Sequence, residues 1–290
     1  MKQLFNMLDN YKKQDYARIQ SSSSILTYKQ CPRKYYNEYI LGIKPEPNIY
    51  LIRGKIVHTV LEHFYDIELD EGSAAYLYEI FWQRLMFLFN KEWSDKKDEF
   101  TKLDLEKKEL EFYKQESREM LHIWLMRFLG KISMRVNKGE DTETAFKNLI
   151  PEREVHIVSE LFGVQGYIDS LLYGEIIDYK TSNKCDLTPE YKIQLGIYCL
   201  LHLIKYNRMP KKAGIDFLKF KEMCIEDEDE LNNLAYQALF EIEQVHMSTT
   251  TNEIEDYPCK ESPLCKWENE RGTGECHHYK KCRNKSLLKN

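Results

Sequence analysis

The stretch from residue 151 to residue 225 most constrains the fold, because strand and helix signals alternate in it at short intervals. Three segments have the composition of strands and are separated by turns at Phe162-Gly163 and Tyr173-Gly174: 154–159, 164–172 and 175–181. A helix, a strand and another helix are then expected over 190–206, 215–220 and 229–248. This order predicts an α/β fold with a mixed sheet flanked by helices.

The second turn sets the register of the hairpin around it. A two-residue loop there pairs Leu172 with Glu175. In the same register Asp169 falls directly opposite Asp178. Strand side chains alternate between the two faces of a sheet, so Lys180 lies on the same face as Asp178. The sequence therefore predicts two carboxylates and one ammonium group on a single patch of sheet.

This patch requires an explanation, because like charges directly opposite each other destabilise a sheet. Mg²⁺ or Mn²⁺ would supply one, since hard divalent ions prefer carboxylate oxygens, polarise a phosphodiester and acidify a bound water. Lys180 would then orient that water or neutralise charge developing on the phosphate. The alternative is a surface hairpin in which Asp169 or Asp178 forms a loose salt bridge with Lys180.

The rest of the chain is expected to belong to the same domain, which we place at residues 1–290. Around the core at 151–225 we expect N-terminal helices, a helical insertion and a cysteine-rich cap, over residues 21–66, 70–148 and 257–290. Pro32 interrupts the first helical stretch and Gly42 ends it. The cap has no apolar periodicity, so something other than a core is expected to hold it.

Charge is unevenly distributed along the chain, whose net charge is −5. Residues 1–55 carry ten Lys and Arg against four acidic residues, and five basic residues without any acid follow Cys276. If the two ends meet, they form a basic surface for phosphates; the alternative is an ordinary solvated surface. The N-terminus lacks the apolar run of a signal peptide and no stretch is long enough to span a bilayer, so a cytoplasmic protein is expected.

The chain has eight cysteines, which in an intracellular protein indicate metal or redox chemistry more than structural disulfides. Three are scattered and require only packing to explain them: Cys185, Cys199 and Cys224. The other five gather near the two ends: Cys31, Cys259, Cys265, Cys276 and Cys282. These five do not look scattered, and metal or redox chemistry would explain them.

Four stretches together resemble a known family. They are Arg53-Gly54-Lys55-Ile56-Val57-His58, Gly166-Tyr167-Ile168-Asp169, Glu175-Ile176-Ile177-Asp178-Tyr179-Lys180-Thr181 and Gln194-Leu195-Gly196-Ile197-Tyr198. In this order they resemble the PD-(D/E)XK nuclease superfamily, in its RecB-like branch. The resemblance covers most of the chain outside the expected helical insertion.

In that superfamily both acids bind the metal and the lysine is catalytic, which implies these roles for Asp169, Asp178 and Lys180. The backbone carbonyl between the second acid and the lysine, here that of Tyr179, can also coordinate the ion. The resemblance thus implies a Mg²⁺- or Mn²⁺-dependent active site on the hairpin.

The two flanking stretches would complete this site from helices. The resemblance implies that His58 joins the metal site, the alternative being a histidine packed within a helix. Gln194 and Tyr198 lie four residues apart and share a helix face. They are implied to face the site, the alternative being the exposed edge of an amphipathic helix.

The stretch from Ser24 to Tyr36 resembles the opening motif of the RecB-like exonucleases that carry a 4Fe-4S cluster, a subgroup that includes AddB-like and CRISPR-associated exonucleases. There, one cysteine lies near the N-terminus and three lie at the C-terminus with C-x2-C-x5-C spacing. This chain keeps the last interval, but ten residues separate the first two C-terminal positions. The implied cluster ligands, with Cys259 as a further candidate, are Cys31, Cys265, Cys276 and Cys282.

Two alternatives to this cluster stay open. One is a zinc site in which His277 or His278 could substitute for a thiolate, with the ligands Cys259, Cys265, Cys276 and Cys282. The other is a set of free buried thiols.

The resemblance implies a restriction-endonuclease-like fold and metal-dependent hydrolysis of DNA, with single-stranded DNA degraded from an end. The expected setting is DNA repair, recombination or CRISPR adaptation, with a helicase or an integration complex as protein partner. The alternative is a non-catalytic nucleic-acid-binding adaptor stabilised by a cysteine-held cluster. RNA stays open as a substrate, because no residue pattern here reads the sugar.

Overall fold

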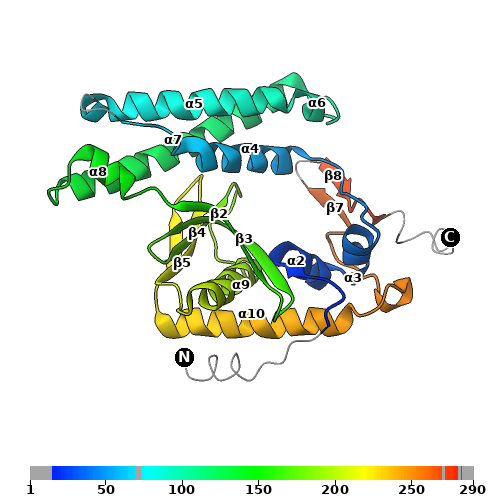
Figure 1. The fold of residues 1–290 in the computed structure, drawn as a ribbon. Coiled ribbons are helices and arrows are strands. Elements are labelled where there is room, and N and C mark those ends of the chain that lie inside the picture. The colour runs from blue at the N-terminus through cyan, green and yellow to red at the C-terminus, as the bar shows by residue number, and fades with distance from the viewer. Residues whose placement is uncertain (1–14, 70–72, 270–271, 280–281, 283–290) are drawn as a thin grey trace.

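The computed structural model describes residues 15–69, 73–269, 272–279 and 282. Its centre is a six-stranded mixed sheet between two layers of helices, as Figure 1 shows. The α/β architecture expected from the sequence is confirmed. Within the described residues no helix combines the length and the apolar character needed to cross a lipid bilayer.

The large sheet has the strand order β1-β3-β4-β5-β6, and β2 pairs with β3. Its strands are β1 (Gln20–Ser21), β2 (Glu152–Ser159), β3 (Val164–Leu172), β4 (Glu175–Lys180), β5 (Lys212–Phe217) and β6 (Glu222–Ile225). The two expected hairpins are present, with β3 antiparallel to both β2 and β4. The next strand, β5, lies parallel to β4. Strands β1 and β6 were not expected from the sequence.

The sheet forks at β3. This strand pairs with β2 over residues 164–171, and it also pairs with β1 at Val164 and Gln165 and with β4 from Ser170 to Leu172. A strand has only two edges, so β1 and β4 must share the edge that β2 leaves open. Strands β3 and β4 therefore pair only near their turn and part beyond it, at residue 169.

One helical layer covers the lower face of the sheet in Figure 1. It consists of α2 (Ser22–Gln30), α9 (Pro189–Tyr206) and α10 (Glu228–Ser248). Their apolar side chains share one core with β2, β3 and β5. At Gly196 the helices α9 and α10 approach so closely that an added Cβ would lie 2.3 Å from the backbone oxygen of Leu234. This contact fixes α9 beneath the sheet.

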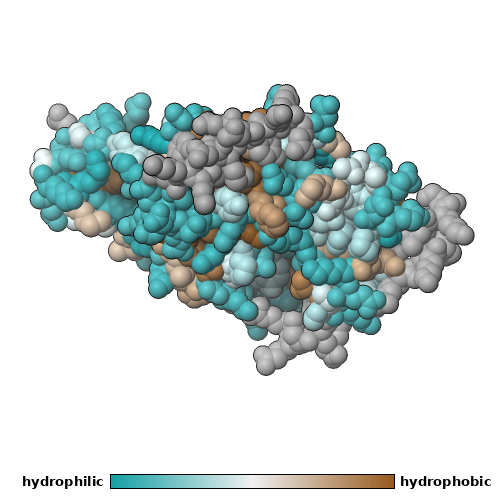
Figure 2. Space-filling view, turned by 90° about the horizontal axis from the view of Figure 1, so that it is seen from below, coloured by the Kyte–Doolittle hydropathy of each residue, from teal (hydrophilic) through white to brown (hydrophobic). Residues whose placement is uncertain are grey.

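The lower face seen in Figure 2 is mostly hydrophilic, with hydrophobic side chains gathered in its central part. A groove of about 930 Å³ runs between α2, α9, α10 and the segment 260–264. Its apolar lining includes Leu26, Ile193, Phe240 and Leu264. None of the site residues proposed from the sequence lines this groove.

The second helical layer covers the upper face and consists mainly of α4 (Ile49–Phe64), α5 (Leu77–Asp95) and α7 (Lys107–Val136). Shorter helices complete it: η2 (Ser73–Tyr76), α6 (Lys97–Phe100) and α8 (Thr142–Lys147). The insertion expected over 70–148 is indeed helical. Its helices nevertheless share one core with α4 and with Ile177 and Tyr179 of β4, so they form a layer of the fold.

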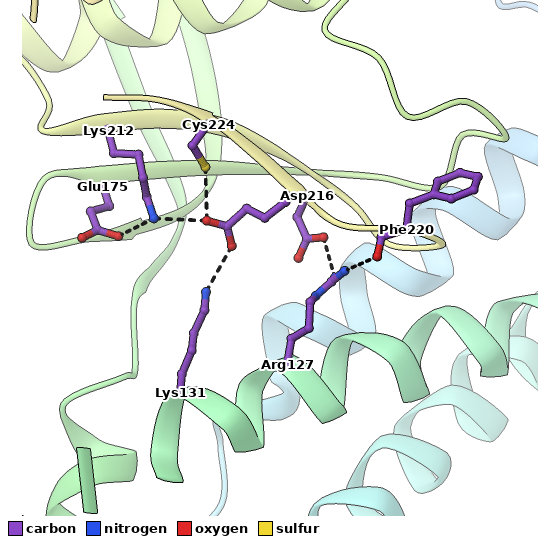
Figure 3. A network of polar contacts seen from close by, with 8 residues as sticks. Arg127, Lys131, Glu175, Lys212, Asp216, Phe220 and Cys224 are labelled. Atoms are coloured by element: carbon purple, nitrogen blue, oxygen red, sulfur yellow. Dashed lines mark hydrogen bonds and ion pairs between the residues drawn. The ribbon is translucent and has the colours of Figure 1, made fainter. Parts of the chain in front are cut away.

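A network of ion pairs also joins α7 to the far edge of the sheet (Figure 3). Arg127 pairs with Asp216 at 2.5 Å, and Lys131 pairs with Glu222 at 3.1 Å. Lys212 links Glu222 at 3.1 Å with Glu175 at 2.8 Å. The helical layer is thus attached by charge as well as by apolar packing.

Beside the sheet, the segment that follows α2 packs against the C-terminal segment. Helix α2 stops before Pro32, as expected, and is followed by α3 (Pro32–Tyr35) and the π-helix η1 (Tyr36–Ile40). Tyr257 of the C-terminal segment is buried against Tyr35 and Tyr36. The expectation that the tail has no core is therefore wrong, because these aromatic rings form a small one.

The short helix η3 (Ile254–Asp256) directly precedes Tyr257. Beyond Tyr257 the tail forms a hairpin of β7 (Lys266–Asn269) and β8 (Gly272–Glu275). Eight residues of the expected basic ends lie outside the described residues: Lys2, Lys12, Lys13, Lys280, Lys281, Arg283, Lys285 and Lys289. Arg53, which was counted toward that surface, is buried.

Candidate active site

Asp169 stands at the fork between β3 and β4, and Glu154 of β2 is its neighbour on the other side. Arg153 pairs with Ser170 and Val155 pairs with Ile168, so Glu154 and Asp169 occupy the level between these pairs. The ladder skips this level, and Glu154 has a φ of 47°, a conformation that costs energy in a residue with a side chain. Such local strain is typical of functional sites.

Asp169 is held by contacts from two other elements. Its Oδ2 accepts a hydrogen bond of 2.7 Å from the backbone N–H of Tyr179 in β4. The same oxygen lies 3.3 Å from Nδ1 of His58 on α4. Ligand atoms of His58, Glu154 and Asp169 all lie within 4.8 Å of one another, close enough to bind one metal ion. The structure thus brings three potential ligands from three separate elements to one point.

Asp178 has a different set of partners, although it lies only nine residues further along the chain. Its Oδ2 forms an ion pair of 2.5 Å with Nζ of Lys180. Its Oδ1 accepts a hydrogen bond of 2.8 Å from Gln194 and one of 3.4 Å from the hydroxyl of Tyr198, both on α9. Gln194 also donates to Tyr198 at 2.8 Å. These contacts fix the orientation of the Asp178 carboxylate.

The predicted hairpin register is confirmed for the three pairs nearest the turn, which end at Ser170 with Ile177. The expectation that Asp169 and Asp178 face each other directly is not met, because the strands part at this level. Asp178 takes its hydrogen bonds from α9, whereas Asp169 contacts α4 and the β4 backbone. The two carboxylates still influence each other, because the negative charge of Asp169 contributes to raising the pKa of Asp178.

Burial dominates the electrostatics of these acids. The side chain of Asp178 is only 2% exposed, and burial raises its pKa against the opposing effect of Lys180. Burial also raises the pKa of Glu154, with a further contribution from Asp169. Burial lowers the pKa of His58, but the contact with Asp169 outweighs it and the net shift is upward. The site therefore binds positive charge favourably.

This donor set fits a hard divalent cation. Three carboxylates and one lysine leave a net charge of about −2 when all are ionised. The Oδ2 atom of Asp178 accepts no hydrogen bond within the described residues, and its contact is the ion pair with Lys180. The carboxylate oxygens, which outnumber the single imidazole nitrogen, suit Mg²⁺ or Mn²⁺.

The site opens to solvent through a cavity of about 470 Å³ between α4, α5 and β2. Among the residues that line it are His58, Glu154, Lys55 and Lys96. A second cavity of about 420 Å³ lies beyond the end of β4, against Asn183 and Tyr191. The ring of Tyr191 lies 5.6 Å below Nζ of Lys180, so this cavity adjoins the lysine.

The cysteines of the two chain ends also converge. The thiol of Cys259 lies within hydrogen-bonding reach of those of Cys31 and Cys282. Cys265 contributes to the raised pKa of Cys259, and Cys276 contributes to that of Cys282. Burial raises the pKa of Cys282 to about 12. The position of Cys259 within this group was given only as an alternative by the sequence.

The two histidines that were considered as zinc ligands have other partners. Nε2 of His278 lies 3.3 Å from Glu38, and Nδ1 of His277 lies 3.5 Å from Glu46. Among the described residues, all eight cysteines are free thiols. Thiol ligands are therefore available to a cluster without the help of an imidazole.

Glu154 is the residue that the sequence interpretation missed. The sequence did contain the information needed to find Glu154, because the register argument used for the second hairpin also applies to the first. With Ser159 paired to Val164, Glu154 falls at the level of Asp169. Glu154 thus lies beside Asp169 across the first hairpin, at the level where β4 has already parted from β3.

Comparison with known proteins gives one finding. A family model described as the PD-(D/E)XK nuclease superfamily matches residues 20–282, a range that includes every residue of the site. No match was found among curated proteins.

Proposed function

The chain belongs to the PD-(D/E)XK nuclease superfamily, and on this premise we propose that it is a Mg²⁺- or Mn²⁺-dependent deoxyribonuclease that hydrolyses phosphodiester bonds. The single observation that carries the proposal is the convergence of His58, Glu154 and Asp169 within 4.8 Å, next to the Asp178–Lys180 ion pair. A binding protein would gain nothing from such a concentration of buried negative charge.

The ligands proposed for the ion are His58, Glu154 and Asp169, with Asp178 and the backbone carbonyl of Tyr179 completing its shell. When bound, such an ion polarises a phosphodiester oxygen and lowers the pKa of a bound water. His58 and Asp169 already contact each other at 3.3 Å, so the ligands are largely preorganised.

Lys180 is proposed to act as a cation and not as a base. Burial lowers its pKa, but the contact with Asp178 outweighs burial and raises it, so the amine stays protonated at neutral pH. A fixed ammonium group can orient the attacking water and neutralise charge that develops on the phosphate. Gln194 and Tyr198 are positioning residues, because they donate hydrogen bonds to the carboxylate of Asp178, which in turn forms the ion pair with Lys180.

The substrate is proposed to be single-stranded DNA degraded from a free end. Support comes from the resemblance of the N-terminal stretch to cluster-containing exonucleases and from the convergence of the thiols that this resemblance requires. A role in DNA repair, recombination or CRISPR adaptation follows from the same resemblance, with a helicase or integration complex as partner.

The thiols are proposed to hold a 4Fe-4S cluster, with zinc as the alternative. Cys31 and Cys282 are two of the ligands. Cys259, which contacts both, is a better third ligand than the spacing suggested. Cys265 and Cys276 compete for the fourth position.

The proposal is tested with labelled linear and circular DNA, single- and double-stranded, incubated with Mg²⁺, with Mn²⁺ or with chelator. We expect metal-dependent loss of linear single-stranded DNA. Asp178→Ala and Lys180→Ala should each reduce the rate by about 10²–10³. Lys184→Ala, which removes an exposed lysine beyond the end of β4, should keep the wild-type rate.

Undiminished activity in Lys180→Ala would refute the assignment of the site. Binding of DNA without cleavage in any divalent metal would favour the alternative function, a non-catalytic adaptor.

A further inference from the structure

Two tyrosines from different elements form an aromatic surface near the candidate active site. Tyr50 of α4 and Tyr113 of α7 pack edge to face, with ring centroids 5.6 Å apart and hydroxyls 3.2 Å apart. Tyr50 is 45% exposed, and the neighbouring Phe112 is 60% exposed. Phe112 packs against Tyr113 at 5.4 Å. The three rings, which we name the aromatic platform, expose a large apolar area to solvent.

A buried cation lies beneath this platform. The guanidinium of Arg53 is 5.5 Å from the ring centroid of Tyr50 and 5.6 Å from that of Tyr113. Arg53 is only 2% exposed, and its Nε has no hydrogen-bond acceptor within the described residues. Arg53 and Lys219 both pair with Glu116, so two positive charges share one negative charge. The platform therefore lies over the positively charged guanidinium of Arg53.

Arg53 connects the platform to the end of the catalytic strand. It donates a hydrogen bond of 2.9 Å to the carbonyl of Thr181, the residue that follows Lys180. Along α4, Tyr50 precedes His58 by eight residues, which corresponds to about 12 Å at a rise of 1.5 Å per residue. The platform is therefore within reach of a DNA strand that extends a few nucleotides from a phosphate at the metal site.

Exposed aromatic rings beside positive charge are the pattern by which proteins bind single-stranded nucleic acid. Bases stack on the rings, and stacking needs an unpaired base. We infer that the aromatic platform binds an unpaired base of the DNA strand entering the active site, an inference that rests on the proposed nuclease function. The platform would thereby select single-stranded over double-stranded DNA.

The competing explanation is that Tyr50 and Tyr113 only shield Arg53 from water. A leucine separates the two roles, because it keeps apolar cover over the guanidinium but offers no ring for stacking. Tyr50→Leu is therefore the informative variant, and Tyr50→Phe keeps the ring while removing the hydroxyl. Phe87→Ala, which removes an exposed ring of α5, is the matched control.

Binding of fluorescein-labelled single-stranded and duplex oligonucleotides is measured by anisotropy in chelator, at one fixed salt concentration. We expect Tyr50→Leu and Tyr113→Leu each to weaken single-strand binding about tenfold, since stacking contributes about 1–3 kcal/mol per base. Duplex binding should change less than about twofold. Tyr50→Phe and Phe87→Ala should bind as the wild type does. Thermal unfolding of each variant confirms that it is folded.

A second measurement uses 2-aminopurine placed at successive positions of the oligonucleotide. One position should lose fluorescence on binding the wild type and keep it with Tyr50→Leu. Wild-type single-strand affinity in Tyr50→Leu, or no single-strand binding by the wild type, would overturn the inference. Because chelator is present, these outcomes do not depend on cleavage. A protein that stacks DNA through Tyr50 but cleaves in no metal would instead refute the nuclease function.

Discussion

At the residue scale, the site depends on the partners that fix its two aspartates. Asp178 is held by Lys180 and Gln194, and Asp169 is held by His58 and the Tyr179 amide. Glu154 differs, because it has a strained backbone and no ladder pairing with Asp169. In our proposal Glu154 keeps this unfavourable φ because it is a metal ligand beside His58 and Asp169.

Glu154→Gln should therefore weaken Mn²⁺ binding at least about tenfold, because it removes one carboxylate from the ion while preserving size. Titration calorimetry with Mn²⁺ measures this directly and needs no substrate. Glu152→Gln, an exposed residue on the same strand, is the control and should bind as the wild type does. Equal affinity of Glu154→Gln and wild type would remove Glu154 from the ligand set.

At the element scale, the attachment of α7 to the sheet involves a carboxyl group whose pKa lies near 6. Arg127 of α7 pairs with Asp216 of β5, whose side chain is 5% exposed (Figure 3). Burial raises the pKa of Asp216 from 3.8 to about 6, even though Arg127 opposes the rise. The neighbouring Glu222 behaves oppositely, since its cationic partners Lys131 and Lys212 outweigh burial and lower its pKa to about 2.

The sign of the pH effect follows from these shifts. Asp216 has a higher pKa in the folded protein than in the unfolded chain, so its protonated form stabilises the folded state. This stabilisation is complete below pH 3.8 and is lost as the pH rises through about 6. Between pH 5 and pH 8 this loss is about 1 kcal/mol. Glu222 changes only at lower pH, so it does not contribute in this range.

Asp216→Asn should accordingly gain about 1 kcal/mol in unfolding free energy relative to the wild type when the pH is raised from 5 to 8. Urea unfolding at the two pH values measures it. Asp186→Asn, at an exposed aspartate, should show the same difference from the wild type at both pH values. A constant difference for Asp216→Asn as well would mean that Asp216 does not titrate in this range.

At the scale of the whole molecule, the mixed sheet flanked by helices is consistent with a restriction-endonuclease-like fold. The segment after α2 and the C-terminal segment pack together beside this sheet. Tyr257 packs against Tyr35, and its backbone carbonyl accepts a hydrogen bond of 2.7 Å from Arg33. Cys31 and Cys282 meet nearby through Cys259. The tail is thus held by an aromatic core and, in our proposal, by a cluster.

Protein purified without oxygen should therefore be brown and contain iron and labile sulfide. Cys259→Ser should lower the iron content and the melting temperature, because the cluster joins segments more than 200 residues apart. Cys185→Ser, outside the thiol group, should change neither. Colourless protein with one bound zinc would reject the iron–sulfur proposal, and full iron content in Cys259→Ser would exclude this residue as a ligand.

The sequence by itself determined the two hairpins formed by β2, β3 and β4, the register near the second turn and the face shared by Asp178 and Lys180, because these follow from local periodicity and turn length. The order of the motifs was enough to identify His58, Gln194 and Tyr198 as residues near the acids.

Only the tertiary structure decided which other residues surround each of the two aspartates, Asp169 and Asp178. The fork in the sheet separates Asp169 from Asp178, brings Glu154 and His58 to the first and α9 to the second, and places Cys259 between Cys31 and Cys282. Strand divergence and helix packing depend on contacts between segments far apart in the chain. A local pattern carries no information on such contacts, whereas a hairpin is complete within about twenty residues.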